Sequence, residues 1–506
     1  MVFRVQSGAV LGVDAYRVDV EVDLALGLPY FNTVGLPEGA VKESKVRVGA
    51  ALKNSGYAMP ERRITVNLAP ADVRKDGTAF DLPIALGILG AAGLVDPEQV
   101  QPWFLCGELS LTGDMRPVRG ALPLAVAARA HGARGIILPP DNGAEAAVVE
   151  GLEVRCARRL DEIVAFFSGQ DELSGPGEEK PASSHALGEL DLADVAGQEQ
   201  AKRALEVAAA GGHNLLLIGP PGSGKTMLAR RLATILPAMS FEESLETTKV
   251  YSVMGLLSGC GLIRERPFRA PHHTISDVGL VGGGSVPRPG EVSLAHNGLL
   301  FLDELPEFKK HVLEVLRQPL EEGRVVISRA LASVVYPGRM MLVSAMNPCP
   351  CGYAGDPKRA CTCSSVDVAR YRARLSGPLL DRIDLHVEVP AVAYRELRGE
   401  RRGETSAVVQ ARVEAARERQ RQRFKNSAAR CNATMSAAQL RRHARPDGES
   451  ERLLETVVDR LGMSARAHDR ILKVARTIAD LEGKDEISAA HVAEAIGYRC
   501  LDRRLG

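Results

Sequence analysis

Eight residues at 219–226 constrain the fold of this chain more than any other feature. They read Gly-Pro-Pro-Gly-Ser-Gly-Lys-Thr and stand between a short apolar run at 214–218 and a helix-prone stretch. In such a strand–loop–helix segment, glycines let backbone N–H groups face a phosphate, which the helix N-terminus also attracts. Lysine adds charge at the outer phosphates, and the threonine hydroxyl can bind Mg²⁺. The residues predicted to bind ATP are Gly219, Pro220, Pro221, Gly222, Ser223, Gly224, Lys225 and Thr226.

Two acids follow a second apolar run. Leu299–Leu302 has the character of a buried strand, and Asp303 and Glu304 come directly after it. Asp303 would hold Mg²⁺, directly or through water, and Glu304 is the candidate general base that polarises the attacking water. An acid pair at a strand end is a weak signal alone, but together with a phosphate-binding loop it predicts ATP hydrolysis. The fold class expected around these motifs is α/β.

Composition excludes few functions. The 506 residues suffice for about three domains. The net charge of +1 gives no overall bias toward nucleic acid, but residues 393–506 hold 24 Lys and Arg against 17 Asp and Glu. Within them, Val408–Arg430 is helix-forming and rich in arginine. It is compatible with a solvated helix face carrying Glu–Arg pairs, or with a surface that contacts nucleic acid.

The sequence predicts a cytoplasmic protein that does not enter a membrane. The N-terminus lacks a basic region followed by an apolar one. The longest apolar stretch, Leu82–Val95, is too short to cross a bilayer and is expected to be a core helix. Nine cysteines follow no disulfide-scaffold pattern, which favours a reducing compartment.

Composition and patterning divide the chain into four parts. Residues 1–167 mix strand-like alternation with Ala-rich helical segments, and residues 168–189 have the Gly, Ser, Pro and Glu content of a linker. Residues 190–392 hold the nucleotide motifs, and residues 393–506 show helical spacing throughout.

Several long and unusual segments carry a resemblance to a known family. They are Phe-Arg-Ala-Pro-His-His at 268–273, Gly-Glu-Val-Ser-Leu-Ala-His-Asn-Gly at 290–298, Met-Asn-Pro-Cys-Pro-Cys-Gly at 346–352 and Ser-Gly-Pro-Leu-Leu-Asp-Arg-Ile-Asp-Leu at 376–385. Over essentially its whole length the chain resembles the YifB/ComM family of magnesium-chelatase-like AAA+ ATPases. This resemblance implies an AAA+ core at 190–392 with pore insertions, followed at 393–506 by a basic helical lid.

The resemblance also implies roles for three residues. Asn347 matches sensor 1, which positions water against the γ-phosphate. Arg382 matches the arginine finger that reaches a neighbouring subunit's ATP, and Arg466 matches sensor 2 on the lid. Positive charge at the γ-phosphate oxygens stabilises the transition state. A finger that acts in trans requires a head-to-tail ring, which the family suggests is a homohexamer.

Two insertions resemble elements that line the central pore of related helicases. Gly279–Pro289 resembles a helix-2 insert, and Val325–Tyr336 resembles the hairpin before sensor 1. Arg329 is the first candidate for a DNA contact and Arg288 the second. The alternative is that these Gly-rich and turn residues form ordinary flexible loops.

Residues 1–167 resemble a Lon-type protease domain. Gly35–Ser44, the segment 75–80 and the segment 107–113 carry this likeness. Lon-type proteases cut with a Ser/Lys dyad, in which lysine deprotonates the serine. The resemblance puts Ala79 at the serine position and Leu122 near the lysine position. Peptidase activity is therefore not expected, and the domain is either a scaffold for assembly and substrate guidance or a DNA-binding surface.

Four cysteines form a possible metal site. Cys349 and Cys351 are one close pair, and Cys361 and Cys363 are another. Four thiolates can hold Zn²⁺ tetrahedrally and fix a loop that has no core of its own. The alternatives are free thiols in a reducing compartment and a redox role.

Three functions are compatible with these features. The resemblance implies a DNA helicase or translocase, driven by ATP, that promotes branch migration of single-stranded or branched DNA during natural transformation. A chelatase-type motor that remodels a protein partner for metal insertion is an alternative, against which the Lon-like domain and the cysteines stand. A non-proteolytic unfoldase is another, but it would favour an aromatic pore loop, which the Gly-rich insert lacks.

Overall fold

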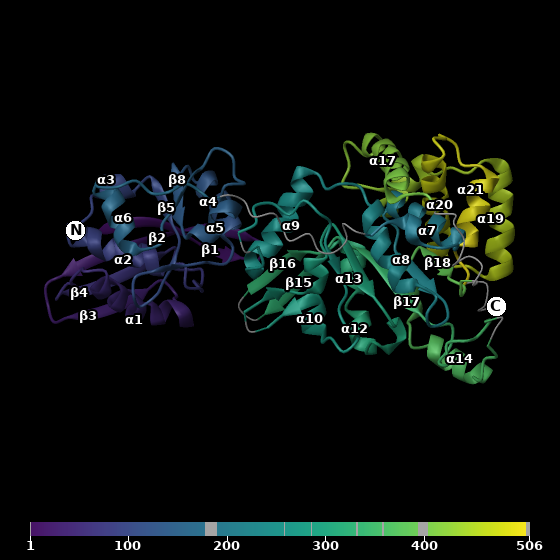
Figure 1. The fold of residues 1–506 in the computed structure, drawn as a ribbon, viewed down its shortest axis with the longest axis horizontal. Helices are drawn as coiled ribbons and strands as arrows, with labels where there is room; N and C mark the ends of the chain where they lie inside the picture. The colour runs from purple at the N-terminus through teal and green to yellow at the C-terminus, as the bar shows by residue number, and fades with distance from the viewer. Residues whose placement is uncertain are drawn as a thin grey trace. The chain divides into compact units, whose positions relative to one another are not determined.

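The computed structural model describes residues 2–177, 190–257, 259–284, 286–329, 332–356, 359–392 and 403–501, without the side chains of Arg329, Ala332 and Leu461 (Figure 1). The described residues form two compact units. The first draws on Met1–Ser183, Phe241–Arg264 and Val326–Tyr336, and the second on Ser184–Ser240, Glu265–Val325 and Pro337–Gly506. The N-terminal unit thus includes two segments from within the predicted nucleotide-binding region.

A mixed sheet organises the first unit. Its strands are β1 (Phe3–Leu11), β2 (Asp14–Ala25), β3 (Tyr30–Val34), β4 (Arg63–Ala69), β5 (Trp103–Leu105), β8 (Gly135–Leu138) and β9 (Glu153–Cys156), in the order β3-β4-β2-β1-β5-β8-β9. β1 and β2 form an antiparallel hairpin, and β2 also pairs antiparallel with β4. Val18, Val20 and Val22 alternate with more exposed residues along β2, so this strand buries one face against the core.

Helices pack on this sheet. They are α1 (Gly39–Asn54), α2 (Asp81–Ala91), α3 (Pro97–Val100), α4 (Ala121–Ala130), α5 (Pro140–Ala146), α6 (Leu160–Phe167) and α9 (Phe241–Met254), with the small hairpin β6 (Glu108–Leu109) and β7 (Met115–Arg116). The predicted core helix is confirmed over 82–91, since every residue of α2 from Asp81 to Leu89 is buried, but it ends at Ala91 and Leu94 is 51% exposed. Leu173 is buried as well, and Ser174 pairs with Cys156, so the fold of this unit continues past residue 167.

A parallel sheet organises the second unit. Its strands are β10 (Leu215–Ile218), β11 (Phe268–Arg269), β14 (Leu299–Leu302), β17 (Met341–Met346) and β18 (Leu385–Glu388), in the order β11-β14-β17-β10-β18. β10 pairs in parallel with β17 on one side and β18 on the other. Both faces of β10 and β14 are buried, which explains why their sequences are continuous apolar runs. The expected α/β fold is confirmed.

Helices and short hairpins complete this unit. Around the sheet lie η1 (Leu192–Asp194), α7 (Glu199–Gly211), α8 (Lys225–Leu232), η2 (Ala233–Ile235), α10 (Asp277–Val281), α11 (Glu291–Leu294), η3 (Leu305–Glu307), α12 (Lys310–Glu314), α13 (Arg317–Glu322), α14 (Ser365–Arg372) and α15 (Gly377–Leu380). The C-terminal part is α17 (Ser406–Arg423), η4 (Asn432–Thr434), α18 (Ala437–His443), α19 (Gly448–Leu461), α20 (Ala465–Leu481) and α21 (Ala489–Gly497). β12 (Gly282–Gly283) pairs with β13 (Arg288–Pro289) in this unit, whereas β15 (Arg324–Arg329) pairs with β16 (Ala332–Pro337) in a hairpin whose segment Val326–Tyr336 belongs to the first unit. None of the helices in the described ranges has the length and hydrophobicity that a membrane-spanning helix requires.

The arginines of α17 hold this helix to its neighbours. Arg412 pairs with Glu206 of α7 at 2.5 Å, and Arg417 donates to the backbone carbonyl of Ala209, also in α7, at 2.9 Å. Arg423 pairs with the fully buried Asp480 of α20 at 2.5 Å. These arginines therefore join α17 to α7 and α20, an internal role that neither the solvated helix face nor the nucleic-acid surface considered from the sequence describes.

A buried carboxylate joins the sheet to α20. Asp384 precedes β18 and pairs with Arg470 at 2.6 Å and with His213 at 3.1 Å. Burial alone would raise the pKa of Asp384, but the charge of Arg470 and the hydrogen bond from His213 hold it well below its ordinary value. Asp384 therefore stabilises the fold as a carboxylate, and this contribution is lost only as the pH falls below the unfolded pKa toward the folded one.

We predict that Asp384→Asn lowers the stability of the protein by about 3 kcal/mol, because it leaves the partly buried Arg470 without its counter-charge. Thermal melting followed by circular dichroism measures the loss. The difference from the parent should be equal at pH 5 and pH 8, since Asp384 stays ionised at both. Asp381→Asn, in the partly exposed acid of the same segment, is the control. A loss below about 1 kcal/mol, or one confined to pH 8, would contradict the prediction.

Candidate active site

The phosphate-binding loop connects β10 to α8. Lys225 donates to the carbonyls of Gly219 at 2.8 Å and Pro220 at 2.9 Å, and to Oδ1 of Asn347 at 3.2 Å. Burial lowers the pKa of Lys225, and the charges of nearby acids oppose this shift. Gly219 has no room for a side chain, because a Cβ there would lie 2.1 Å from the carbonyl oxygen of Val389. The loop therefore needs glycine for packing as well as for phosphate access.

The acid pair lies beside the start of α8. The hydroxyl of Thr226 donates to Oδ2 of Asp303 at 2.7 Å, and the backbone N–H of Glu304 donates to Oδ1 at 2.9 Å. A hydroxyl and a carboxylate at this separation are oxygen ligands of the kind Mg²⁺ prefers. Glu304 itself has a φ of 52°, in the left-handed region that non-glycine residues rarely occupy. Such conformations are concentrated at functional sites, where the surrounding structure holds them.

His273 is a residue that the sequence analysis did not assign to the site. Its Nδ1 lies 3.4 Å from a carboxylate oxygen of Glu304, and its ring lies 4.1 Å from that of His272. His272 is held in turn by Thr274 at 2.9 Å. His273 belongs to the segment 268–273, which identifies the family but does not by itself indicate a contact with Glu304. His273 is thus placed to influence the orientation of the candidate base.

The three residues to which the family resemblance assigns roles lie in different surroundings. Asn347 directly follows β17 and contacts Lys225, as a sensor on the adjacent strand would. Arg382 is buried and pairs with Glu321, so a role in a neighbouring subunit would require this ion pair to open. Arg466 is exposed in the first turn of α20. The three roles remain predictions.

The predicted DNA contacts lie on the two insertions. Arg288 is exposed, in the β12–β13 hairpin. The other insertion is the expected hairpin of β15 and β16, and the side chain of Arg329 at its end lies outside the described residues.

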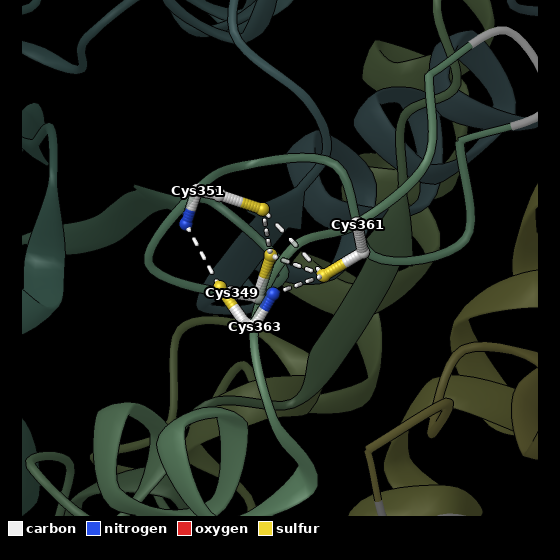
Figure 2. Close-up of side chains that lie close together, drawn as sticks. All are labelled: Cys349, Cys351, Cys361 and Cys363. Carbon is white, nitrogen blue, oxygen red and sulfur yellow. Dashed lines mark hydrogen bonds between the residues drawn. The ribbon is translucent and has the colours of Figure 1, made fainter.

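Four cysteine sulfurs form a cluster after β17 (Figure 2). The Sγ atoms of Cys349 and Cys351 are 3.3 Å apart, and that of Cys361 lies 3.6 Å from the first and 3.5 Å from the second. The Sγ of Cys363 completes a group whose members all lie within 4.8 Å of one another. Hydrogen bonds from backbone N–H groups at Tyr353 and Thr362 lower the pKa of Cys351 to about 5. The donor set suits a tetrahedral thiolate site.

The positions that the expected Lon-type resemblance aligns with a Ser/Lys dyad hold apolar side chains. Leu122 is fully buried at the start of α4, and Ala79 packs against the same cluster. The backbone carbonyl of Ser252, in α9, accepts from the backbone N–H of Gly120 at 2.9 Å. Its side-chain hydroxyl accepts from the backbone N–H of Leu122 at 3.2 Å. Leu245 of α9 packs on this cluster too. Neither apolar side chain can transfer a proton, and α9 occupies the amides at the start of α4.

Three family models match successive parts of the chain. A family model described as subunit ChlI of Mg-chelatase matches residues 20–142. A second, described as magnesium chelatase, subunit ChlI, matches residues 191–397, and a third for the C-terminal part of that subunit matches residues 403–499. The phosphate loop, the acid pair and the parallel sheet thus define an ATPase core of the magnesium-chelatase-like AAA+ class.

Full-length relatives narrow this class. Competence protein ComM of Haemophilus influenzae is 47% identical, over 99% of this chain and 98% of its own length. YifB of Escherichia coli is 47% identical, over 99% of this chain and 97% of its own length. The magnesium-chelatase 38 kDa subunit of Rhodobacter capsulatus is 28% identical, over 42% of this chain and 59% of its own length. The chain belongs to the YifB/ComM family of magnesium-chelatase-like proteins.

We predict that Lys225→Ala and Glu304→Gln separate ATP binding from ATP turnover. Loss of the lysine charge should weaken nucleotide binding, whereas loss of the base should leave binding intact and lower kcat about 10²-fold or more. A fluorescent ATP analogue measures the affinity, and phosphate release measures the rate. Glu304→Gln protein that hydrolyses ATP at the parental rate would exclude Glu304 as the base.

Proposed function

We propose that this chain is the subunit of a ring-shaped ATPase that translocates DNA and promotes branch migration. The observation that carries the hydrolysis is the convergence of Lys225, Asn347 and the Thr226–Asp303 pair beside Glu304. With Mg²⁺ and ATP bound, Lys225 would face the outer phosphates while Thr226 and Asp303 hold the ion. Glu304, the residue after Asp303, would be the base that activates the attacking water.

The ring follows from the assignment of Arg382. If its guanidinium completes the ATP site of a neighbouring subunit, the subunits must meet head to tail. Such interfaces form a ring when the rotation from one subunit to the next closes on itself. In the single chain Glu321 holds this guanidinium. Assembly would therefore exchange one acidic partner for the phosphates of the adjacent subunit, which makes hydrolysis depend on the oligomer.

DNA is the favoured substrate for two reasons. The relative ComM, similar over its full length, is named a competence protein, which supports a role with incoming DNA. Arg288 is exposed on an insertion of the ATPase core, where a phosphate backbone could reach it.

A chelatase-type motor is the alternative. The match at residues 20–142 also carries the magnesium-chelatase description, so the presence of an N-terminal domain does not argue against it. The chelatase subunits nevertheless align over less than half of this chain, whereas ComM and YifB align over nearly all of it. An assay of porphyrin metallation with candidate partner subunits would distinguish the two functions.

We predict that single-stranded or four-way DNA raises the ATPase rate several-fold, and that DNA binding weakens steeply with salt because phosphate contacts release counterions. Arg288→Ala should weaken DNA binding without changing the DNA-free rate. Arg441→Ala, an exposed arginine of α18, should change neither and is the matched control. Size-exclusion chromatography with light scattering, in the presence of ATP, reports the ring. Absence of both DNA binding and stimulation would contradict the DNA-motor proposal while leaving the ATPase assignment intact.

We further propose that the cysteine cluster binds a structural Zn²⁺. Protein prepared with zinc in the medium should carry one zinc per chain by elemental analysis. Cys363→Ser should lower this content, whereas Cys431→Ser, a buried cysteine outside the cluster, should preserve it. Zinc-free parental protein would leave the reduced-thiol and redox interpretations.

A further inference from the structure

The loop that carries the cysteines also forms one wall of the nucleotide site. The chain runs from Met346, the last residue of β17, through Asn347 to Cys349. The carbonyl of Met346 accepts from the backbone N–H of Gly219 at 3.2 Å. The first cysteine of the cluster therefore lies two residues beyond Asn347, the candidate sensor, and three beyond Met346, whose carbonyl bonds to the phosphate-binding loop.

Gly352 brings the cysteine loop directly onto the phosphate-binding loop. Its φ is 87°, and its N–H donates to the carbonyl of Cys349 at 3.0 Å. A Cβ at this position would lie 2.6 Å from Cδ and 2.8 Å from Cγ of Pro221. Only glycine therefore permits this contact between the turn at Cys349 and the loop that would enclose the phosphates.

The other end of the cysteine loop leads to a second contact. Cys363 is followed by Ser364, the N-cap of α14, and the phenolic oxygen of the buried Tyr371 in this helix accepts from the backbone N–H of Asn347. Arg374, just beyond the helix, pairs with Glu307 at 3.0 Å. The chain from Cys349 through α14 to Arg374 thus touches the phosphate-binding loop, the candidate sensor and the segment after the acid pair.

The loop that carries the cysteines is not held by secondary structure among its described residues. Among its described residues, those between Cys349 and Cys363 form neither helix nor strand. Four thiolates around Zn²⁺ at about 2.3 Å would hold their sulfurs about 3.8 Å apart, close to the separations observed here. A metal would accordingly fix the loop in a shape that the backbone alone does not impose.

We propose that a zinc ion held by the four cysteines positions Pro221 and Asn347, so that ATP turnover depends on zinc as well as on Mg²⁺. This inference rests on the proposed ATPase activity and on the proposed zinc site. The zinc takes no part in the chemistry. It holds two groups that contact the nucleotide pocket, and displacing such groups by about 1 Å can slow a reaction about 10²-fold.

The test uses the full chain, loaded with zinc and then stripped with a zinc-selective chelator under reducing conditions and excess Mg²⁺. We expect stripping to lower kcat about tenfold or more while the far-ultraviolet circular dichroism is preserved, and return of Zn²⁺ to restore the rate. ATPase activity that is unchanged after complete loss of zinc would overturn the inference and leave the proposed function standing. Zinc-loaded protein without ATPase activity would instead overturn the proposed function on which the inference depends.

A pair of glycine variants tests the contact itself. Gly352 and Gly355 have φ values of 87° and 82°, so alanine is equally strained at both. A Cβ on Gly352 meets Pro221, whereas a Cβ on Gly355 meets nothing within 4 Å. Gly352→Ala should therefore lower kcat several-fold more than Gly355→Ala, with zinc content the same in both. Equal rates in the two variants would overturn the proposed positioning role, even if zinc removal inactivates the protein by another route.

Discussion

The parallel pairing of β17 between β10 and β14 is the constraint on which the site depends. Because the carboxyl ends of neighbouring parallel strands meet at one edge of a sheet, the loops after Ile218, Leu302 and Met346 must lie together. Lys225, Asp303 and Asn347 belong to these loops, although more than a hundred residues separate the first from the last. A change of strand order would separate the charge, the ion ligands and the sensor, whatever their local geometry.

The sequence predicted the parts of this arrangement that local chemistry dictates. A Gly-rich loop between an apolar run and a helix, or an acid pair behind another apolar run, has one dominant structural interpretation, so Lys225 and Asp303 could be placed before the fold was known. The strands around them were visible as apolar runs because both faces of the sheet are covered. The basic helix α17 was ambiguous, because composition cannot tell arginines that face solvent from arginines paired with buried acids on α7 and α20.

Long-range contacts were beyond the sequence. Nothing in the spacing of His273 and Glu304 says that an imidazole lies beside the candidate base, since the contact arises from the packing of β11 against β14. The pairing of Arg382 with Glu321 was hidden for the same reason. The motif that suggests an arginine finger predicts where a residue acts in an assembly, whereas the partner it holds in the single chain follows from tertiary packing.

The N-terminal unit is completed by chain that the ATPase core supplies. Its helix α9 comes after β10 and α8 in the sequence, yet Ser252 accepts from the backbone N–H groups of Gly120 and Leu122. A chain truncated after residue 177 would lack this helix and expose those amides and the apolar residues around Leu122. The unit is therefore not a module that recombination could move intact between proteins. Its inheritance is tied to that of the nucleotide-binding core, because the helix that covers the start of α4 follows the phosphate-binding loop in the sequence.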